Sequence, residues 1–143
     1  MNLNHIWKGG LSGLLSTLLI SVVMIIKKNI GFSTQFNPVE VLSNSLNLHF
    51  VSYGWYLHYF LGVMFGIIFS VIYYHIPGES RFRGFIFGAG IWLIMMIIVM
   101  PLSGMGFFAM NIGSNVAMYT FIIHIIYGIF LGIIYGFLDK KMS

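Results

Sequence analysis

Cysteine is absent from this 143-residue sequence, and charged side chains are scarce. The absence of cysteine excludes disulfides, thiolate metal ligands, covalently attached haem and palmitoylation. Lysine and arginine together number seven and the acids three, which is 7% of the chain, whereas 59% of the residues are apolar. Because so few charges cannot cover the surface of a water-soluble domain, the composition indicates an integral membrane protein.

The shortage of acidic side chains also restricts catalysis. The three acids, Glu40, Glu79 and Asp139, fall in predicted loops or at a helix end. They lie far from the histidines of the hydrophobic segments, so no serine–histidine–acid triad is expected. Glycine is abundant, but it lies inside predicted membrane helices and does not form the phosphate-binding loops that follow strands. We therefore expect a protein that is not an enzyme.

Long hydrophobic segments make up most of the chain. A helix needs about 20 mostly apolar residues to cross the hydrocarbon core of a bilayer. The first hydrophobic segment resembles a signal peptide, but no cleavage motif follows it and Lys27-Lys28 closes it, so we expect it to remain as a helix. The sequence accommodates four membrane helices, expected at about 6–26, 53–76, 84–100 and 115–138.

Proline marks the ends of two predicted elements. Pro101 cannot donate the next backbone hydrogen bond, so we expect the third membrane helix to stop there. Asn37-Pro38-Val39-Glu40 combines the N-cap, the first-turn proline and the capping acid of a helix start. This motif predicts a short interfacial helix at about 38–47 on the outer side.

Basic residues lie close to the ends of the predicted helices and do not gather on one face. Nucleic acid is therefore not an expected partner. One side of the membrane would carry both termini with Lys8, Arg81, Arg83, Lys140 and Lys141, against Lys27 and Lys28 on the other. The positive-inside rule then places both termini and the turn 77–83 in the cytoplasm.

One pattern occurs twice along the chain. It reads His58-x3-Gly62-x3-Gly66 in the second predicted membrane helix and His124-x3-Gly128-x3-Gly132 in the fourth. The preceding helices match through Lys8-Gly9-x3-Gly13 and Arg83-Gly84-x3-Gly88. The expected fold is therefore all-α, a single domain over residues 1–143 that forms a polytopic membrane four-helix bundle from two repeated helical hairpins.

Glycines four residues apart flatten one side of a helix. A neighbouring backbone can then approach closely enough for dispersion contacts to stabilise helix pairs in lipid. We expect this packing role for Gly9, Gly13, Gly62, Gly66, Gly84, Gly88, Gly128, Gly132 and Gly136.

His58 and His124 continue the glycine stripes one turn outward, so both should face the bundle interior at similar depth. Each imidazole either makes a structural hydrogen bond or belongs to a shared site. We expect a polar site in an outer-side pocket formed by these histidines, Trp55, Trp92 and the loop 102–114. The pocket predicts a non-enzymatic binding or permeation module or an accessory subunit. Four helices are few for an autonomous transporter, so a homo-oligomer or a larger membrane complex is expected.

The alternative function is redox chemistry or cofactor binding. His58 and His124 could ligate one b-type haem axially or a metal ion. A catalytic zinc would need a third ligand, for which Glu40 and His49 are the nearest candidates. Methionines gather toward the outer half of the third and fourth helices, which is typical both of adaptable packing and of thioether copper sites.

With these motifs the sequence resembles a family of small four-helix bacterial membrane proteins classed as a domain of unknown function, close in size and style to the YagU-like inner-membrane proteins. The motifs that carry the resemblance are Lys8-Gly9-x3-Gly13-x3-Thr17, Trp55-x2-His58-x3-Gly62-x3-Gly66, Arg83-Gly84-x3-Gly88-x3-Trp92, Met100-Pro101-Leu102-x-Gly104-x-Gly106 and His124-x3-Gly128-x3-Gly132. The resemblance implies the fold and the membrane location, implies no activity, and directs attention to His58, His124 and Pro101.

Overall fold

A computed structural model describes residues 3–29, 37–45 and 50–141. These residues form helices joined by turns, with no strand among them. The long helices are α1 (Leu3–Asn29), α3 (Val51–Ile72), α4 (Ser80–Ile94) and α6 (Ser114–Lys141). The short ones are α2 (Pro38–Ser45), η1 (Tyr73–His75), the π-helical η2 (Met95–Val99), α5 (Met100–Leu102) and η3 (Phe107–Ala109).

Four helices in the described ranges are long and apolar enough to cross a membrane. The expectation of an all-α membrane bundle is thereby confirmed. The spans are Asn4–Ile26, Val51–His75, Ser80–Leu102 and Ser114–Lys140, so most of them extend a few residues beyond the expected limits. The interfacial helix begins at Pro38 as expected, where Asn37 Oδ1 accepts a hydrogen bond from the Val39 amide at 3.1 Å, and it is described as far as Ser45.

The expectation that the third membrane helix stops at Pro101 is wrong. The π-helical η2 precedes the proline, and Met100 donates its amide to the carbonyl of Met95, one residue further back than in an α-helix. Pro101 then lies at the start of the final turn, α5, where a missing N–H costs least. The helix therefore continues through the proline to Leu102.

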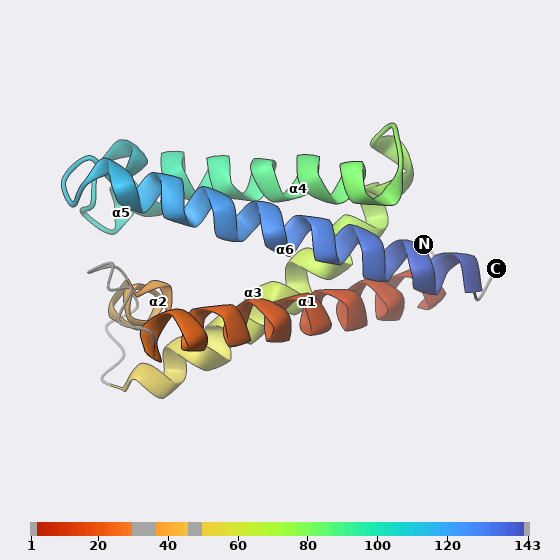
Figure 1. The fold of residues 1–143 in the computed structure, drawn as a ribbon, viewed down its shortest axis with the longest axis horizontal. Helices are drawn as coiled ribbons and strands as arrows, with labels where there is room; N and C mark the ends of the chain where they lie inside the picture. The colour runs from red at the N-terminus through yellow and green to blue at the C-terminus, as the bar shows by residue number, and fades with distance from the viewer. Residues whose placement is uncertain (1–2, 30–36, 46–49, 142–143) are drawn as a thin grey trace.

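The four long helices pack as two pairs (Figure 1). One pair is α1 with α3 and the other is α4 with α6, and α1 also packs along α6 to join the pairs. Both ends of the chain lie at one end of the bundle, while α2 and α5 lie at the opposite end. We call the first the inner end and the second the outer end.

Glycines lie where the backbones of each pair meet. A Cβ added to Gly13 would lie 3.0 Å from the Cα of Gly66, and one added to Gly88 would lie 3.2 Å from the Cα of Gly128. Only glycine permits such an approach without displacing a neighbouring backbone. The neighbouring backbone crowds Gly9, Gly13, Gly66, Gly84, Gly88, Gly128 and Gly132 in this way, whereas Gly62 meets the side chain of Thr17 and Gly136 meets those of Ser80 and Tyr73. The two pairs use similar contacts, but their origin by duplication stays a prediction.

The inner half of the bundle is filled by large side chains. Phe69, Leu131 and Tyr135 are fully buried and pack with Ile20, Tyr73, Phe87, Ile91 and Tyr127 in one cluster. A second cluster at the outer end joins Met96, Met100, Ala109 and Val116. The interior at the level of the first cluster is therefore closed by packed side chains.

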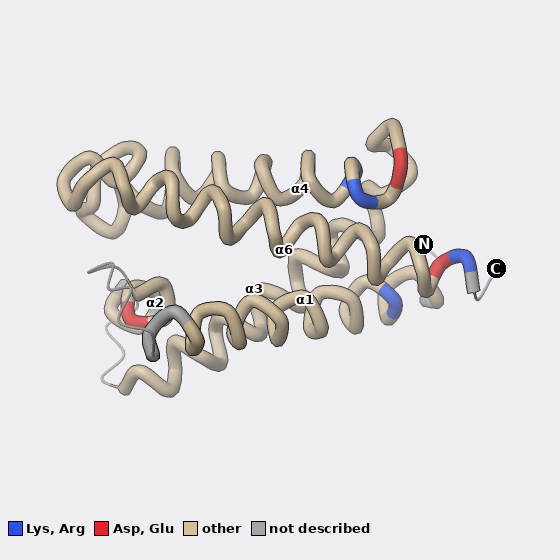
Figure 2. Tube along the Cα trace, in the orientation of Figure 1, with Lys and Arg blue, Asp and Glu red and all other residues tan. Residues whose placement is uncertain are grey.

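An ion pair ties the two helix pairs together at the inner end. Lys8 of α1 is 3% exposed and Asp139 of α6 is 7% exposed, and the Lys8 ammonium donates to Asp139 Oδ1 at 3.3 Å. The hydroxyl of Tyr74 donates to the other carboxylate oxygen. Figure 2 shows charged residues gathered at this end of the bundle and few along its length. The first helix is thus fastened to the last by a buried charge pair.

Candidate functional site

A cavity of about 200 Å³ lies between the two helix pairs in the outer half of the bundle. Every long helix contributes to its wall, together with α2, η2 and α5. The lining residues are Thr17, Ile20 and Met24 of α1, Pro38 and Val41 of α2, His58, Leu61, Gly62 and Phe65 of α3, Ile91 and Ile94 of α4, Met95 and Val99 of η2, Met100 of α5, and Thr120, Ile123, His124 and Tyr127 of α6. The wall is almost wholly apolar apart from the two histidines and two threonines.

His124 has a defined tautomer in this cavity. Its Nδ1 lies 2.7 Å from the carbonyl oxygen of Thr120, one turn earlier on α6. A carbonyl oxygen can only accept, so Nδ1 carries the proton and donates it. In the neutral ring Nε2 then has a lone pair and acts as a hydrogen-bond acceptor or a metal ligand.

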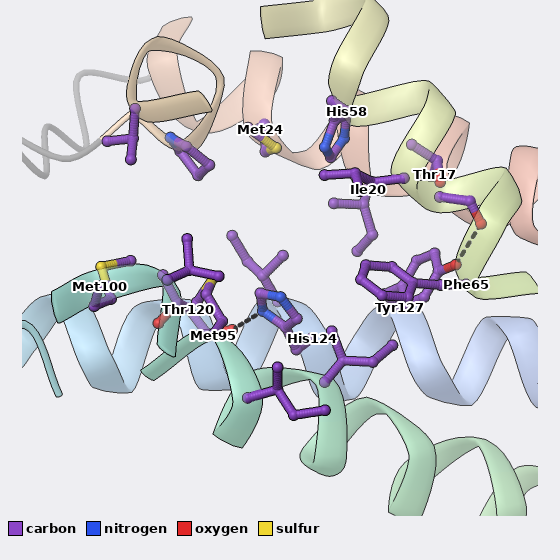
Figure 3. Close-up of a pocket in the computed structure, with 18 residues that line it drawn as sticks. Thr17, Ile20, Met24, His58, Phe65, Met95, Met100, Thr120, His124 and Tyr127 are labelled. Carbon is purple, nitrogen blue, oxygen red and sulfur yellow. Dashed lines mark hydrogen bonds between the residues drawn. The ribbon is translucent and has the colours of Figure 1, made fainter. Parts of the chain in front are cut away.

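His58 faces the same cavity from α3 on the opposite side (Figure 3). Its Nε2 is buried and has no hydrogen-bond partner within the described part of the chain. The ring is held by edge contacts to Trp55 and Tyr59, with centroid separations of 5.9 and 5.8 Å. The structure thus brings both predicted histidines to one cavity.

The floor of the cavity is formed by Tyr127 and Phe65. The Tyr127 hydroxyl donates to the carbonyl of Gly62 at 2.9 Å, which joins α6 to α3 directly below the histidines. The inner hydrophobic cluster begins at this level, since Tyr127, Ile20 and Ile91 belong to it. The cavity is therefore a pocket in the outer half and is not continued through the bundle along the packed inner half.

Two side chains of the pocket wall also reach the outer surface of the bundle. Ile94 is 58% exposed and Val99 is 38% exposed, and both also line the cavity. These two residues lie in the outer half of the third membrane span.

The two tryptophans expected in the site lie outside the lining of the cavity. Trp55 stacks on Tyr59 and makes an edge contact with the His58 ring. The Trp92 indole donates to the carbonyl of Ala117 at 3.1 Å and lies 3.3 Å from the hydroxyl of Thr120. Trp92 therefore packs against the outer cluster and contacts the pocket wall at Thr120 of α6.

The loop 102–114 also lies outside the pocket lining. Phe108 packs edge-on against Trp92, and Ala109 is fully buried in the outer cluster. Phe108 and Ala109 have φ values of 50° and 58°, in the left-handed region that side chains rarely adopt. The loop covers the outer end of the α4–α6 pair and so supports the pocket indirectly.

Sequence reasoning considered Met95 and Met100 only as part of a larger group of methionines and missed Met24, although all three lie in the pocket wall. Met24, Met95 and Met100 line the cavity together with the histidines (Figure 3). Methionine is so common in irregular packing that its spacing alone gave no reason to single out these three. Thr17 was visible only as a small residue, although its hydroxyl donates to the Gly13 carbonyl at 2.8 Å and its side chain reaches the cavity.

Comparison with known proteins gives a family but no activity. The profile of a family described as a family of unknown function (DUF6789) matches residues 3–143. No curated protein and no solved structure matches the chain. The match agrees with the expected membership in an uncharacterised family, and what the pocket does must be argued from its chemistry.

Proposed function

We propose that this chain, which belongs to the DUF6789 family of unknown function, is a membrane protein that binds a lipophilic hydroxyl compound in the pocket between its helix pairs. The observation that carries the proposal is the pair of imidazoles in an apolar wall. His124 presents an acceptor at Nε2, and His58 has a buried Nε2 without a partner. A hydroxyl in this pocket can donate to Nε2 of His124 or hydrogen-bond to Nε2 of His58.

The buried imidazole nitrogen of His58, unpartnered within the described residues, favours such a ligand. A buried polar group without a hydrogen bond costs roughly 1–3 kcal/mol, and a bound hydroxyl removes that cost. The remaining wall is apolar and matches an alkyl or isoprenoid chain. Since a water occupies about 30 Å³ in the liquid, the cavity of about 200 Å³ accommodates a short chain or the end of a longer one.

Binding is favoured over permeation. A conducting path needs a pore that continues through the whole membrane thickness. The packed cluster around Phe69, Leu131 and Tyr135 occupies the inner half of the bundle below the pocket. A ligand would therefore enter from the lipid and leave by the same route.

A b-type haem does not fit the pocket. Cavities for drug-sized ligands span roughly 300–1,000 Å³, whereas this one measures about 200 Å³. A macrocycle would have to separate α3 from α6, which the hydrogen bond from Tyr127 to Gly62 opposes. A catalytic zinc also lacks a ligand set, because no group of three histidine or acidic side chains is found within the described residues. His49 lies outside those residues, and the Glu40 carboxylate on α2 accepts a hydrogen bond from the side-chain amide of Asn37.

A soft metal ion is the second candidate ligand. Three thioethers, from Met24, Met95 and Met100, line the cavity with the two imidazoles. Thioether and imidazole ligands suit copper(I). Histidine resonances separate the two candidates when each is added alone, because only a ligand that binds in the pocket should shift the Nε2 signals.

The proposed function is tested with histidine-selective ¹⁵N labelling of the protein in lipid nanodiscs. We expect 1-octanol to shift the Nε2 resonances of His58 and His124, and octane, which lacks the hydroxyl, to leave them unchanged. Leu61→Trp should fill the cavity and abolish the octanol shift, whereas Met64→Trp, on the exposed side of the same helix, should not. Equal effects of octanol and octane, or a full response in Leu61→Trp, would refute the proposal. Copper(I) shifting both resonances while octanol leaves them unchanged would favour the metal.

The cellular setting is a further part of the proposal. We place the chain in the bacterial cytoplasmic membrane with both termini in the cytoplasm. Support comes from Lys8, Arg81, Arg83 and Lys140, which lie at the ends of spans that share the inner end. A homo-oligomer or a larger membrane complex is the proposed working form, because four helices are few for a membrane protein that acts alone.

A further inference from the structure

A second hollow, of about 740 Å³, opens at the inner end of the bundle. It lies between η1, the turn that precedes α4, the first turn of α4 and the last turns of α6. These segments are the ends of three membrane spans, so the hollow lies at the depth of the lipid headgroups. Arg81, Arg83 and Lys140 line it.

Arg83 is held in place and has unused hydrogen-bonding capacity. Its guanidinium carbon lies 4.4 Å from the centre of the Tyr73 ring and 5.8 Å from that of Tyr74. Its Nε is buried and has no hydrogen-bond partner among the described residues. Such a stacked guanidinium keeps a fixed orientation and presents its donors as a fork.

The acids of the hollow do not neutralise its arginines. Asp139 pairs with Lys8 and accepts from Tyr74, and Glu79 forms no ion pair with either arginine within the described ranges. Basic side chains therefore outnumber the acids that remain to balance them. The Ser80 hydroxyl, 2.5 Å from that of Tyr73, adds a polar group to the same wall.

One wall of the hollow is apolar and faces the membrane. Ile133 and Phe137 of α6 line the hollow and are exposed on the bundle surface. A free anion would gain nothing from them. A molecule with a phosphate and an acyl chain would contact both the basic residues of the hollow and this apolar wall.

We infer that this hollow binds an anionic phospholipid, with its phosphate oxygens at Arg81 and Arg83 and an acyl chain along Ile133 and Phe137. The bidentate geometry of a guanidinium suits two phosphate oxygens, and the position at the span ends suits a headgroup. This site is separate from the histidine pocket, so it stands whether or not that pocket binds a hydroxyl compound.

The test is native mass spectrometry of the purified protein with defined lipids. We expect the wild type to retain phosphatidylglycerol and not phosphatidylcholine. Loss of one basic group should weaken retention about fivefold in Arg83→Gln and in Arg81→Gln, and about 25-fold in the double variant. Arg81 is exposed, so its substitution reports binding without disturbing the packed core.

Lys28→Gln is the matched control, since it removes one positive charge at the far end of α1. It should retain phosphatidylglycerol as the wild type does. Wild-type retention by the double arginine variant, or equal retention of the two lipids, would overturn the inference. Complete displacement of phosphatidylglycerol by excess inorganic phosphate would show that the hollow recognises a free anion, and would overturn the assignment to a lipid.

Discussion

At the scale of single residues, His58 is the side chain whose environment departs most from what burial normally requires. Its Nε2 is buried in an apolar cavity and has no hydrogen-bond partner in the described chain, whereas Nδ1 of His124 donates to the Thr120 carbonyl. A buried polar atom without a hydrogen bond destabilises the fold. Such a cost is typical of sites whose polar group serves a ligand.

Replacing His58 by leucine should therefore raise stability and abolish binding. We expect His58→Leu to gain about 1 kcal/mol, because an unsatisfied polar group is replaced by an apolar one of similar size. Thermal unfolding in detergent, followed by circular dichroism, measures the change. His124→Leu, which removes a made hydrogen bond, should not gain. Equal losses in both variants would mean that His58 makes a structural hydrogen bond.

At the scale of elements, each helix pair depends on glycines at chosen positions. Gly88 and Gly90 lie on the same helix, yet a Cβ on Gly88 would meet the backbone of His124 and Gly128 on α6, while one on Gly90 would meet nothing within 4 Å. The pair contact is therefore specific to one face of α4. Sequence spacing alone distinguishes these faces, since Gly84 and Gly88 are one turn apart and Gly90 is not in their row.

Gly88→Ala and Gly90→Ala should act in opposite directions. The first forces α4 and α6 apart and should cost roughly 1–3 kcal/mol, as overpacking does. The second should stabilise by about 0.5–1 kcal/mol, because alanine restricts the unfolded chain and favours helix. Thermal unfolding of the two variants under identical detergent conditions decides the matter. If both variants changed stability alike, α4 would not meet α6 along this face.

At the scale of the whole molecule, the two helix pairs are joined at the inner end and enclose a cavity in the outer half. The inner cluster and the Lys8–Asp139 pair fasten them, and the cavity begins above Tyr127. The packed inner end holds the two helix pairs together below the cavity, so the proposed ligand would not have to separate them.

Breaking the Lys8–Asp139 pair should weaken this junction. Lys8→Met leaves Asp139 as a buried charge without its lysine, and removal of one partner of a buried pair costs roughly 3–5 kcal/mol. The double variant Lys8→Met/Asp139→Leu should recover most of that loss, because apolar replacements of buried pairs are often neutral. A double-mutant cycle measured by thermal unfolding checks the coupling. Additive losses would show that the two charges do not act as a pair.

Orientation in the membrane is a second prediction at this scale. Reporter fusions after Ser143 and within the turn 77–83 should both report the cytoplasm, since basic residues gather at that end. A fusion near Ser43 should report the outside. A reporter after Ser143 that reads external would reverse the assignment and place the arginine-lined hollow in the outer leaflet.

The sequence by itself determined the class of this protein, the four membrane helices and the two histidines worth attention. Hydrophobic length and four-residue spacing are local properties, so they are readable without coordinates. Only the tertiary structure decided which side chains share the pocket with His58 and His124, because that depends on how the helices rotate and cross. The same holds for Trp55 and Trp92, which support the pocket from outside its wall.

Pro101 shows most directly why the sequence alone could not predict every part of the fold. A missing N–H predicts the end of a regular α-helix, and the sequence shows nothing of the π turn that shifts the hydrogen bonds before the proline. The partners of Lys8 and Arg83 were equally hidden, since Asp139 and Tyr73 reach them only after distant segments pack together. Local composition thus sets the helices, while contacts between residues far apart in the chain decide what lies between them.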